Sequence, residues 1–227
     1  MRVNGITVTK PAGKILPEDV LTVEDLPFVG RGGLKLAGAL EAFPVTPEGA
    51  VCLDVGASTG GFTDCLLQRG AKLVYAVDVG HDQLDAALRA DERVVCMEGT
   101  DVRDLTALPQ DPAFCSIDVS FISLKLVLPA VYPLLAPHAQ CIALVKPQFE
   151  AGRRHIGKNG IVRDARVHAQ VLGDVLTLAQ GLGFAVQGLC VSPVQGGSGN
   201  TEFLVHLEKG AQTAASPEAL IRALSLR

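Results

Sequence analysis

The chain has 227 residues, of which 48% are hydrophobic, and a formal net charge of −4 at pH 7. This length and apolar content predict one main domain with a substantial core. The acidic balance excludes a broad basic surface and limits nucleic-acid contact to local patches. The most apolar region, residues 126–145, is excluded as a membrane span because Pro129, Pro133 and Pro137 interrupt it.

The cysteines indicate the compartment. All 6 lack C-x-x-C spacing, and most lie within apolar runs, as small core residues do. Free thiols of this kind are typical of a reducing environment. The first residues do not have the pattern of a secretory signal peptide, so we expect a cytoplasmic protein. We also expect that the protein uses no metal.

Residues 3–23 alternate apolar and polar side chains around glycine and proline, a pattern that predicts short strands with turns. We expect these strands at residues 6–8, 14–16 and 20–23. A unit of this size is too small to fold alone. We therefore interpret residues 1–25 as the end of a small module and residues 26–227 as the main domain.

A glycine-flanked basic turn follows, and it contains Arg31. The turn leads into an amphipathic helix predicted at residues 34–42. Lys35 lies in this helix between Leu34 and Leu36. Local sequence alone favours a solvated helix lysine at this position.

A strand predicted at residues 51–55 runs into a glycine turn and a helix predicted at residues 62–68. This arrangement presents free backbone N–H groups to a ligand. Phe62 stands where a phosphate-binding P-loop has lysine, and Ala57 and Ser58 fill the place of the middle glycine of a dinucleotide fingerprint. Asp54, just before the glycines, fits the ammonium group of S-adenosylmethionine, which has no phosphate. Glycines required only for packing remain an alternative interpretation.

A second strand, predicted at residues 72–78, ends in Asp78. Its distance from Asp54 is close to the ~20 residues at which βαβ nucleotide-binding folds place a carboxylate on ribose hydroxyls. A helix at residues 83–89 and a strand at residues 94–97 come next, and a polar loop then borders the expected adenine. The candidate cofactor-binding residues are Asp54, Gly56, Ala57, Ser58, Thr59, Gly60, Gly61, Phe62, Asp78, Val79, Thr100, Asp101 and Val102.

Two further strands, predicted at residues 113–121 and 141–147, are separated by a helix at residues 124–135. Strands that alternate with helices predict an α/β fold with a doubly wound, mostly parallel sheet covered on both faces. Ligands of such sheets bind beyond the carboxyl ends of the strands, where Asp118 and Lys146 fall together with the acids of the earlier strands. Pro147 should end the last strand.

Residues 149–166 form the densest basic stretch, for which phosphate contact and a solvated loop are both open interpretations. A long helix at residues 165–182, strands at 185–191 and 201–207, and a tail helix from Ser216 follow. Glu202 lies at the start of the last strand. The candidate RNA-binding residues are Arg31, Arg153, Arg154, Lys158 and Arg163.

The chain closely resembles the TlyA family in five ordered motifs, which are Arg31-Gly-Gly-Leu-Lys35, Leu53-Asp-Val-Gly-Ala-Ser-Thr-Gly-Gly-Phe62, Asp118-Val-Ser-Phe-Ile-Ser-Leu124, Val145-Lys-Pro-Gln-Phe-Glu150 and Gly199-Asn-Thr-Glu-Phe203. This family was first named for haemolysis and is now described as rRNA ribose 2′-O-methyltransferases related to FtsJ. The resemblance implies a Rossmann-like methyltransferase that uses S-adenosyl-L-methionine and acts on ribosomal RNA or ribosomal subunits, with cytidine as the suggested nucleotide. It also implies that residues 1–25 are the second half of an S4-like (alpha-L) RNA-binding module, whose helical first half is absent from this chain.

The Lys-Asp-Lys-Glu catalytic tetrad of FtsJ-like enzymes falls on Lys35, Asp118, Lys146 and Glu202. The resemblance thus assigns Lys35 a catalytic function in place of a solvated one. Two features depart from the family pattern. Asp101 stands where the family usually has asparagine, and residues 195–198 lack the usual lysine.

A ribose 2′-hydroxyl is a poor nucleophile until its proton leaves, and an ordinary lysine, with a pKa of ~10.4, is protonated near neutrality. Partial burial and a second ammonium both favour the neutral amine. We expect Lys146 to be the general base, Lys35 and Glu202 to position the ribose, and Asp118 to hold Lys146. Residues 118–121 lack the paired prolines that cradle a base amine in amino-group methyltransferases, which favours methylation of oxygen.

Two other functions stay open at this point. The acidic charge and the short first module are compatible with an RNA-associated protein that binds S-adenosylmethionine with little or no turnover. A haemolysin-type membrane activity rests on the former family name alone.

Overall fold

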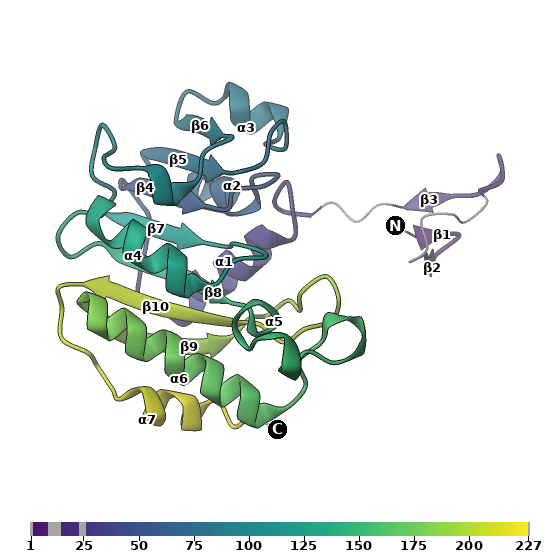
Figure 1. The fold of residues 1–227 in the computed structure, drawn as a ribbon. Coiled ribbons are helices and arrows are strands. Elements are labelled where there is room, and N and C mark those ends of the chain that lie inside the picture. The colour runs from purple at the N-terminus through teal and green to yellow at the C-terminus, as the bar shows by residue number, and fades with distance from the viewer. Residues whose placement is uncertain (1, 9–14, 23–25, 227) are drawn as a thin grey trace.

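The computed structural model describes residues 2–8, 15–22 and 26–226. Its main body is built on a seven-stranded sheet with the strand order β6-β5-β4-β7-β8-β10-β9 (Figure 1). The strands are β4 (Val51–Val55), β5 (Leu73–Asp78), β6 (Val94–Glu98), β7 (Phe114–Ile117), β8 (Gln140–Val145), β9 (Phe184–Val191) and β10 (Phe203–Lys209). Strand β10 runs antiparallel to β8 and β9, and β4 to β8 are parallel. The predicted doubly wound, mostly parallel sheet is confirmed.

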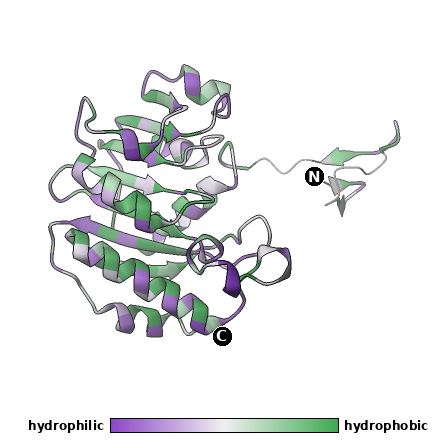
Figure 2. Ribbon diagram, in the orientation of Figure 1, coloured by the Kyte–Doolittle hydropathy of each residue, from purple (hydrophilic) through white to green (hydrophobic). Residues whose placement is uncertain are grey.

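Helices cover both faces of the sheet. They are α1 (Gly32–Ala42), α2 (Gly61–Gln68), α3 (Ala86–Ala90), α4 (Leu124–Leu134), α5 (Pro147–Glu150), α6 (Ala165–Leu182) and α7 (Pro217–Ala223), with short 3-10 turns at η1 (Val102–Asp104), η2 (Arg153–His155) and η3 (Lys158–Gly160). Side chains alternate across a strand. Leu53 of β4 therefore packs in the core with α4 and α6, whereas Cys52 packs on the other face with α1 and α2. Figure 2 shows mostly hydrophobic residues along the central strands.

Three elements differ from the sequence-based expectation. Helix α3 begins at Ala86 instead of residue 83, because the backbone N–H groups of Gln83 and Leu84 donate to Glu98 before the helix starts. Strand β7 ends at Ile117, so residues 118–121 form a loop. Pro147 ends the β8 strand as expected, but it also begins the single helical turn α5.

The N-terminal residues form a separate three-stranded sheet of order β2-β1-β3, from β1 (Arg2–Val3), β2 (Ile6–Thr7) and β3 (Leu21–Thr22). Strand β1 was not anticipated. Of the strand expected at residues 14–16, Lys14 lies outside the described residues, and the other two positions are not in a strand. The small sheet stands apart from the main body in Figure 1. Its assignment to an RNA-binding module stays a prediction.

Candidate active site

The turn after β4 is shaped by a glycine. Gly56 has a φ of +85°, and a Cβ at this position would lie 2.4 Å from the backbone oxygen of Asp118. Only glycine allows the two strand ends to approach so closely. The N–H groups of Gly56 and Ala57 both donate to Val77 O, at 2.8 and 3.1 Å. The ends of β4, β5 and β7 are thereby drawn together at the carboxyl edge of the sheet.

Asp54 does not reach this edge. Its side chain is fully buried, because alternation along β4 turns it toward α2, two positions after Cys52. Both carboxylate oxygens accept from hydroxyls, Oδ2 from Thr63 at 2.7 Å and Oδ1 from Ser116 at 2.8 Å. Burial raises the pKa of Asp54 to about 6, against the opposing effect of these hydrogen bonds. The structure thus places Asp54 beneath the turn, where it joins β4, α2 and β7. Its contact with an ammonium group stays a prediction.

Gly60 also has a packing function. It lies at the N-terminus of α2 with a φ of +98°, and a Cβ there would lie 2.2 Å from Leu88 Cδ1 and 2.9 Å from Leu84 Cδ1. Neither Gly60 nor Asp54 lines the cavities described next. Both residues pack the turn, and their expected function in cofactor binding stays a prediction.

A cavity of about 810 Å³ opens beside the turn, and the ends of β4, β5, β6 and β7 surround it. Seven of the thirteen expected cofactor residues line it, namely Gly56, Ser58, Asp78, Val79, Thr100, Asp101 and Val102. Asp78 is fixed by two backbone donors, Ser58 N–H at 2.8 Å and Gly80 N–H at 2.7 Å. Val79 is 68% exposed, so an apolar surface faces the cavity next to this carboxylate.

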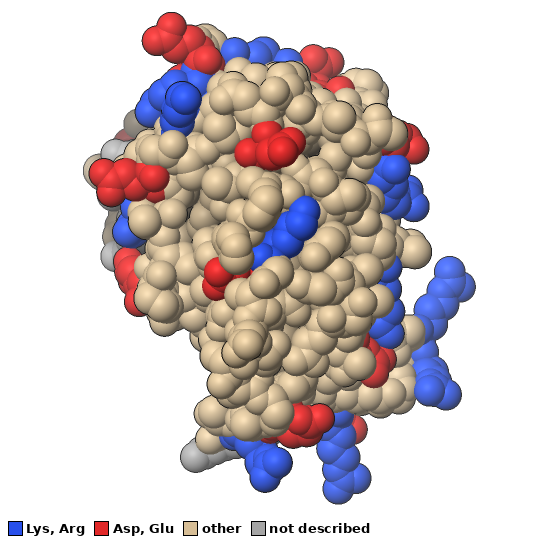
Figure 3. Space-filling model, turned by 90° about the vertical axis from the view of Figure 1, so that its left-hand side faces the viewer, with Lys and Arg blue, Asp and Glu red and all other residues tan. Residues whose placement is uncertain are grey.

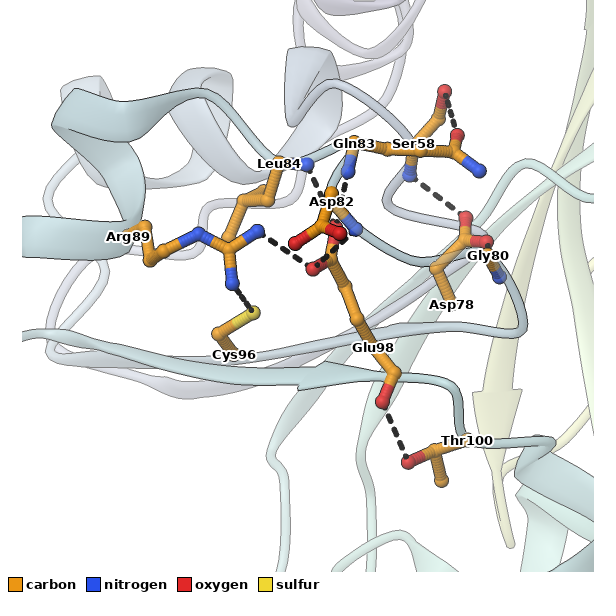
Figure 4. A network of polar contacts seen from close by, with 10 residues as sticks. All are labelled: Ser58, Asp78, Gly80, Asp82, Gln83, Leu84, Arg89, Cys96, Glu98 and Thr100. Carbon is orange, nitrogen blue, oxygen red and sulfur yellow. Dashed lines mark hydrogen bonds and ion pairs between the residues drawn. The ribbon is translucent and has the colours of Figure 1, made fainter.

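The loop that borders this cavity is organised by Glu98, a residue that the sequence did not single out as a ligand or support (Figure 4). Its carboxylate accepts from the N–H groups of Asp82, Gln83 and Leu84 at 2.7–3.0 Å and from Arg89 at 2.6 Å. These donors, first that of Leu84 and then that of Arg89, lower the pKa of Glu98 to about 2. A single carboxylate at the end of β6 thus holds residues 82–84 in place.

Asp101 lies at the other side of the cavity and is already paired. Arg103 Nη2 binds Asp101 Oδ2 at 2.6 Å, and Arg103 Nε binds Oδ1 at 3.0 Å. The bond to Arg103 lowers the pKa of Asp101. Arg103 lines the cavity too, and local sequence gave no signal for it.

A smaller cavity of about 190 Å³ adjoins the first, and the two share Gly56, Ser58, Asp118 and Ser120. Its lining adds four expected cofactor residues, Ala57, Thr59, Gly61 and Phe62. The basic turn closes it from the other side through Arg31. Lys146 also lines this cavity. Two of the expected catalytic residues, Asp118 and Lys146, therefore meet the expected cofactor residues here, whereas Lys35 and Glu202 line neither cavity.

The four tetrad residues form two lysine–carboxylate pairs. Lys146 Nζ lies 2.5 Å from Asp118 Oδ1, and Lys35 Nζ lies 2.6 Å from Glu202 Oε2. Three of these residues are nearly excluded from solvent, with exposures of 9% for Lys35, 8% for Lys146 and 2% for Glu202. Lys35 is thus a buried residue, which agrees with the function implied by the family resemblance and not with a solvated helix position.

Two further side chains hold the pairs and a third holds the nearby start of α4, and sequence reasoning missed all three. Ser120 accepts a hydrogen bond from Lys146 Nζ at 2.9 Å, and Gln148 donates to Glu202 Oε1 at 3.0 Å. Glu150 accepts from the Ser123 hydroxyl and from Leu124 N–H, at 2.5 and 2.7 Å. Their presence in the motifs around Asp118 and Lys146 was the available signal.

Phe121 projects next to the pairs. Its φ is +64°, its side chain is 91% exposed, and its ring lies 5.0 Å from that of Phe149. Lys146 Nζ lies 5.9 Å from the Phe149 ring centre. An uncovered aromatic face therefore lies close to the Lys146–Asp118 pair.

The expected RNA-binding residues do not gather in one place. Arg31 lines the smaller cavity, Arg153 and Arg154 are exposed on η2, and Arg163 lines a third cavity of about 540 Å³. The side chain of Lys158 lies outside the described part of the structure. Figure 3 shows the opposite end of the sheet, where Lys and Arg are interspersed with Asp and Glu.

The described residues contain no group of three or more His, Cys, Asp or Glu side chains placed to hold a metal ion. None of the helices in residues 2–8, 15–22 and 26–226 has the length and apolar character needed to cross a membrane.

Comparison with known proteins gives consistent matches. The model of the FtsJ-like methyltransferase family matches residues 28–209. A protein of Bacillus subtilis named "Putative rRNA methyltransferase YqxC" is 54% identical over 87% of this chain and 72% of its own length. The Mycobacterium tuberculosis protein named 16S/23S rRNA (cytidine-2'-O)-methyltransferase TlyA is 43% identical over 97% of this chain and 84% of its own length. The crystal structure titled "putative hemolysin" from Lactococcus lactis is 51% identical, with a TM-score of 0.83 over 88% of this chain and 99% of that one.

Proposed function

The chain belongs to the FtsJ-like methyltransferase family, and from this we propose that it methylates a ribose 2′-hydroxyl of ribosomal RNA, with S-adenosylmethionine as the methyl donor. The observation that carries the proposal is the Lys146–Asp118 pair at the wall of two adjoining cavities, with the buried Lys35–Glu202 pair linked to the turn after Lys146 by Gln148. The name of the mycobacterial relative supports cytidine as the nucleotide and 16S or 23S rRNA as the substrate.

The residues of the larger cavity fit the donor. Asp78 presents a fixed carboxylate suited to ribose hydroxyls, and Val79 presents an apolar surface suited to an adenine ring. The crowded turn at Ala57 and Ser58 suits a ligand without a pyrophosphate. When bound, S-adenosylmethionine supplies an activated methyl group on a sulfonium. Asp54 acts from beneath, where it fixes the turn and adds negative charge to the field at the site.

The acceptor hydroxyl would enter through the smaller cavity. Lys146 Nζ, at the junction of the cavities, takes the 2′-hydroxyl proton, and Asp118 and Ser120 hold this amine in place. Lys35 and Glu202 orient the ribose. Alignment of the hydroxyl behind the methyl group is a large part of catalysis, because an in-line displacement depends on near-attack geometry.

The surroundings of the pairs suit RNA. The uncovered ring of Phe121 offers a stacking face for a base, an interaction that single-stranded RNA recognition commonly uses. Arg31, at the wall of the smaller cavity, offers a phosphate contact close to the reacting sugar. Arg153 and Arg154 would bind phosphates further along the strand, and residues 1–25 would add affinity as a separate RNA-binding unit.

The test is direct. Protein is incubated with isotope-labelled S-adenosylmethionine and ribosomal subunits that lack the modification, and the label is located by nuclease digestion and mass spectrometry. We expect label on a ribose 2′-oxygen. Label on a base would overturn the assignment to oxygen, and donor binding without any transfer to RNA would favour the binding-protein alternative.

A further inference from the structure

Helix α5 (Pro147–Glu150) follows Lys146 directly, and its side chains bind the residue before β10 and the start of α4. Strand β8, which leads into it, lies between β7 and β10. On the β10 side, Gln148 Nε2 donates to Glu202 Oε1 at 3.0 Å. On the β7 side, Glu150 binds the first residues of α4 through Ser123 and Leu124.

Glu202 is held by two donors of different kinds. Lys35 binds Oε2 at 2.6 Å, and Gln148 binds Oε1. The carboxylate is 2% exposed, so water does not replace either donor. On its other side the 192–200 loop approaches closely, since a Cβ on Gly196 would lie 2.5 Å from Glu202 Oε1.

Gln148 is the link between the two catalytic pairs. Within the described residues, the ion pairs within 4.0 Å join Lys35 only to Glu202 and Lys146 only to Asp118. Gln148 is two residues from Lys146 on the same short turn, and its amide reaches across to Glu202. A shift of this side chain would therefore change the position of one pair relative to the other.

The amide of Gln148 has a second notable feature. Its Oε1 is buried and makes no hydrogen bond within the described structure. The reverse orientation of the amide would place this oxygen against the Glu202 carboxylate, so the contact with Glu202 fixes the orientation. A buried acceptor without a partner is unfavourable for folding. Packing alone therefore does not account for a glutamine at this position.

We propose that Gln148 is a positioning residue for methyl transfer, one that keeps Glu202 and Lys35 in register with Lys146. The proposal rests on the function proposed above. It assigns Gln148 no contact with the methyl donor, because Gln148 does not line the larger cavity.

The first test is Gln148→Ala. Single-turnover methylation of ribosomal subunits, at saturating S-adenosylmethionine, should slow about 10- to 100-fold, as expected when a reacting group is displaced by about 1 Å. The dissociation constant of S-adenosylmethionine, measured by calorimetry, should stay at the wild-type value. A wild-type rate in this variant would overturn the proposal.

The second test, Gln148→Glu, separates positioning from a general loss of structure. It sets a second carboxylate against Glu202, and two adjacent carboxylates share a proton at lower pH but repel each other when both are ionised. The rate of the variant divided by the wild-type rate should therefore fall as pH rises. Lys35 on α1 and the Lys146–Asp118 pair also face this region, but they are present in both proteins, so their contribution largely cancels in the ratio.

Gln212→Glu is the matched control, since it adds the same charge at an exposed position between β10 and α7. Its rate ratio to wild type should stay near one at every pH. A ratio for Gln148→Glu that is equally flat would overturn the proposal. Absence of ribose methylation by the wild-type protein would instead overturn the proposed function, so the two failures are distinguishable.

Discussion

The donor side and the acceptor side of the site are held together in different ways. On the donor side, around the larger cavity, the carboxylates of Asp78 and Glu98 accept mainly from backbone N–H groups of nearby loops, such as Ser58, which is 20 residues from Asp78. On the acceptor side, side chain binds side chain, and Lys35 is 167 residues from Glu202. Donor binding therefore depends on loop conformation, whereas catalysis depends on how distant elements pack.

The largest effect should come from Lys146, the centre of the acceptor side. Lys146→Ala should slow methyl transfer by roughly 10²- to 10⁴-fold, as the loss of a general base does. Lys146→Arg should be nearly as slow, because a guanidinium stays protonated. Single-turnover assays measure the rate, and calorimetry should show near-normal binding of S-adenosylmethionine. Lys72→Ala, at an exposed lysine before β5, is the control. Near-normal turnover by the arginine variant would mean that Lys146 is only a positive clamp.

Asp78 tests the donor side in the same way. Asp78→Asn loses charge at a carboxylate with two backbone donors, and S-adenosylmethionine should bind about 10- to 100-fold more weakly. The transfer step at saturating donor should change much less. The comparison predicts a smaller loss of affinity for Asp54→Asn, since Asp54 does not line the cavity. Equal losses of S-adenosylmethionine affinity in the two variants, measured by calorimetry, would contradict this difference between Asp78 and Asp54.

The same contrast explains what the sequence could predict. The succession of strands along the chain, the glycine turn and the acids at strand ends follow from local pattern. The structure places Asp78 and Asp118 at the carboxyl edge of the sheet, as expected. The Lys35–Glu202 pair joins an N-terminal helix to the last strand, so no local spacing predicts it, and only the family resemblance brought the two residues together. The structure adds that Asp54 is buried, because the alternation along β4 turns its side chain inward. Its contact with the ligand stays a prediction.

The burial of Asp54 should appear in the pH dependence of stability. Its pKa rises from 3.8 to about 6 on folding, so the folded state binds this proton more tightly than the unfolded state. The resulting stabilisation is fully present below the unfolded pKa and is lost as pH rises through about 6. Relative to Asp54→Asn, which cannot titrate, the wild-type protein should lose about 2 kcal/mol of stability from about pH 4 to about pH 7. Urea unfolding of both proteins across this range measures the difference, and a constant difference would mean that Asp54 is not buried as an acid.

Glu98 should give the smallest effect, because its network lies at the edge of the donor side. Its pKa is lowered to about 2, so its charge stabilises the fold above the unfolded value of ~4.3, and this stabilisation is lost as pH falls toward about 2. Glu98→Gln keeps one acceptor but loses the charge that binds three N–H groups and Arg89. The loop at residues 82–84 should loosen, and the dissociation constant of S-adenosylmethionine should rise several-fold while the saturated rate stays close to wild type. Glu92→Gln, at an exposed position outside the network, should change neither quantity.

Thermal melts give a second test. From about pH 5 downward, the difference in melting temperature between wild type and Glu98→Gln should become smaller, and a difference that grows instead would show that the Glu98 carboxylate is not held by these donors.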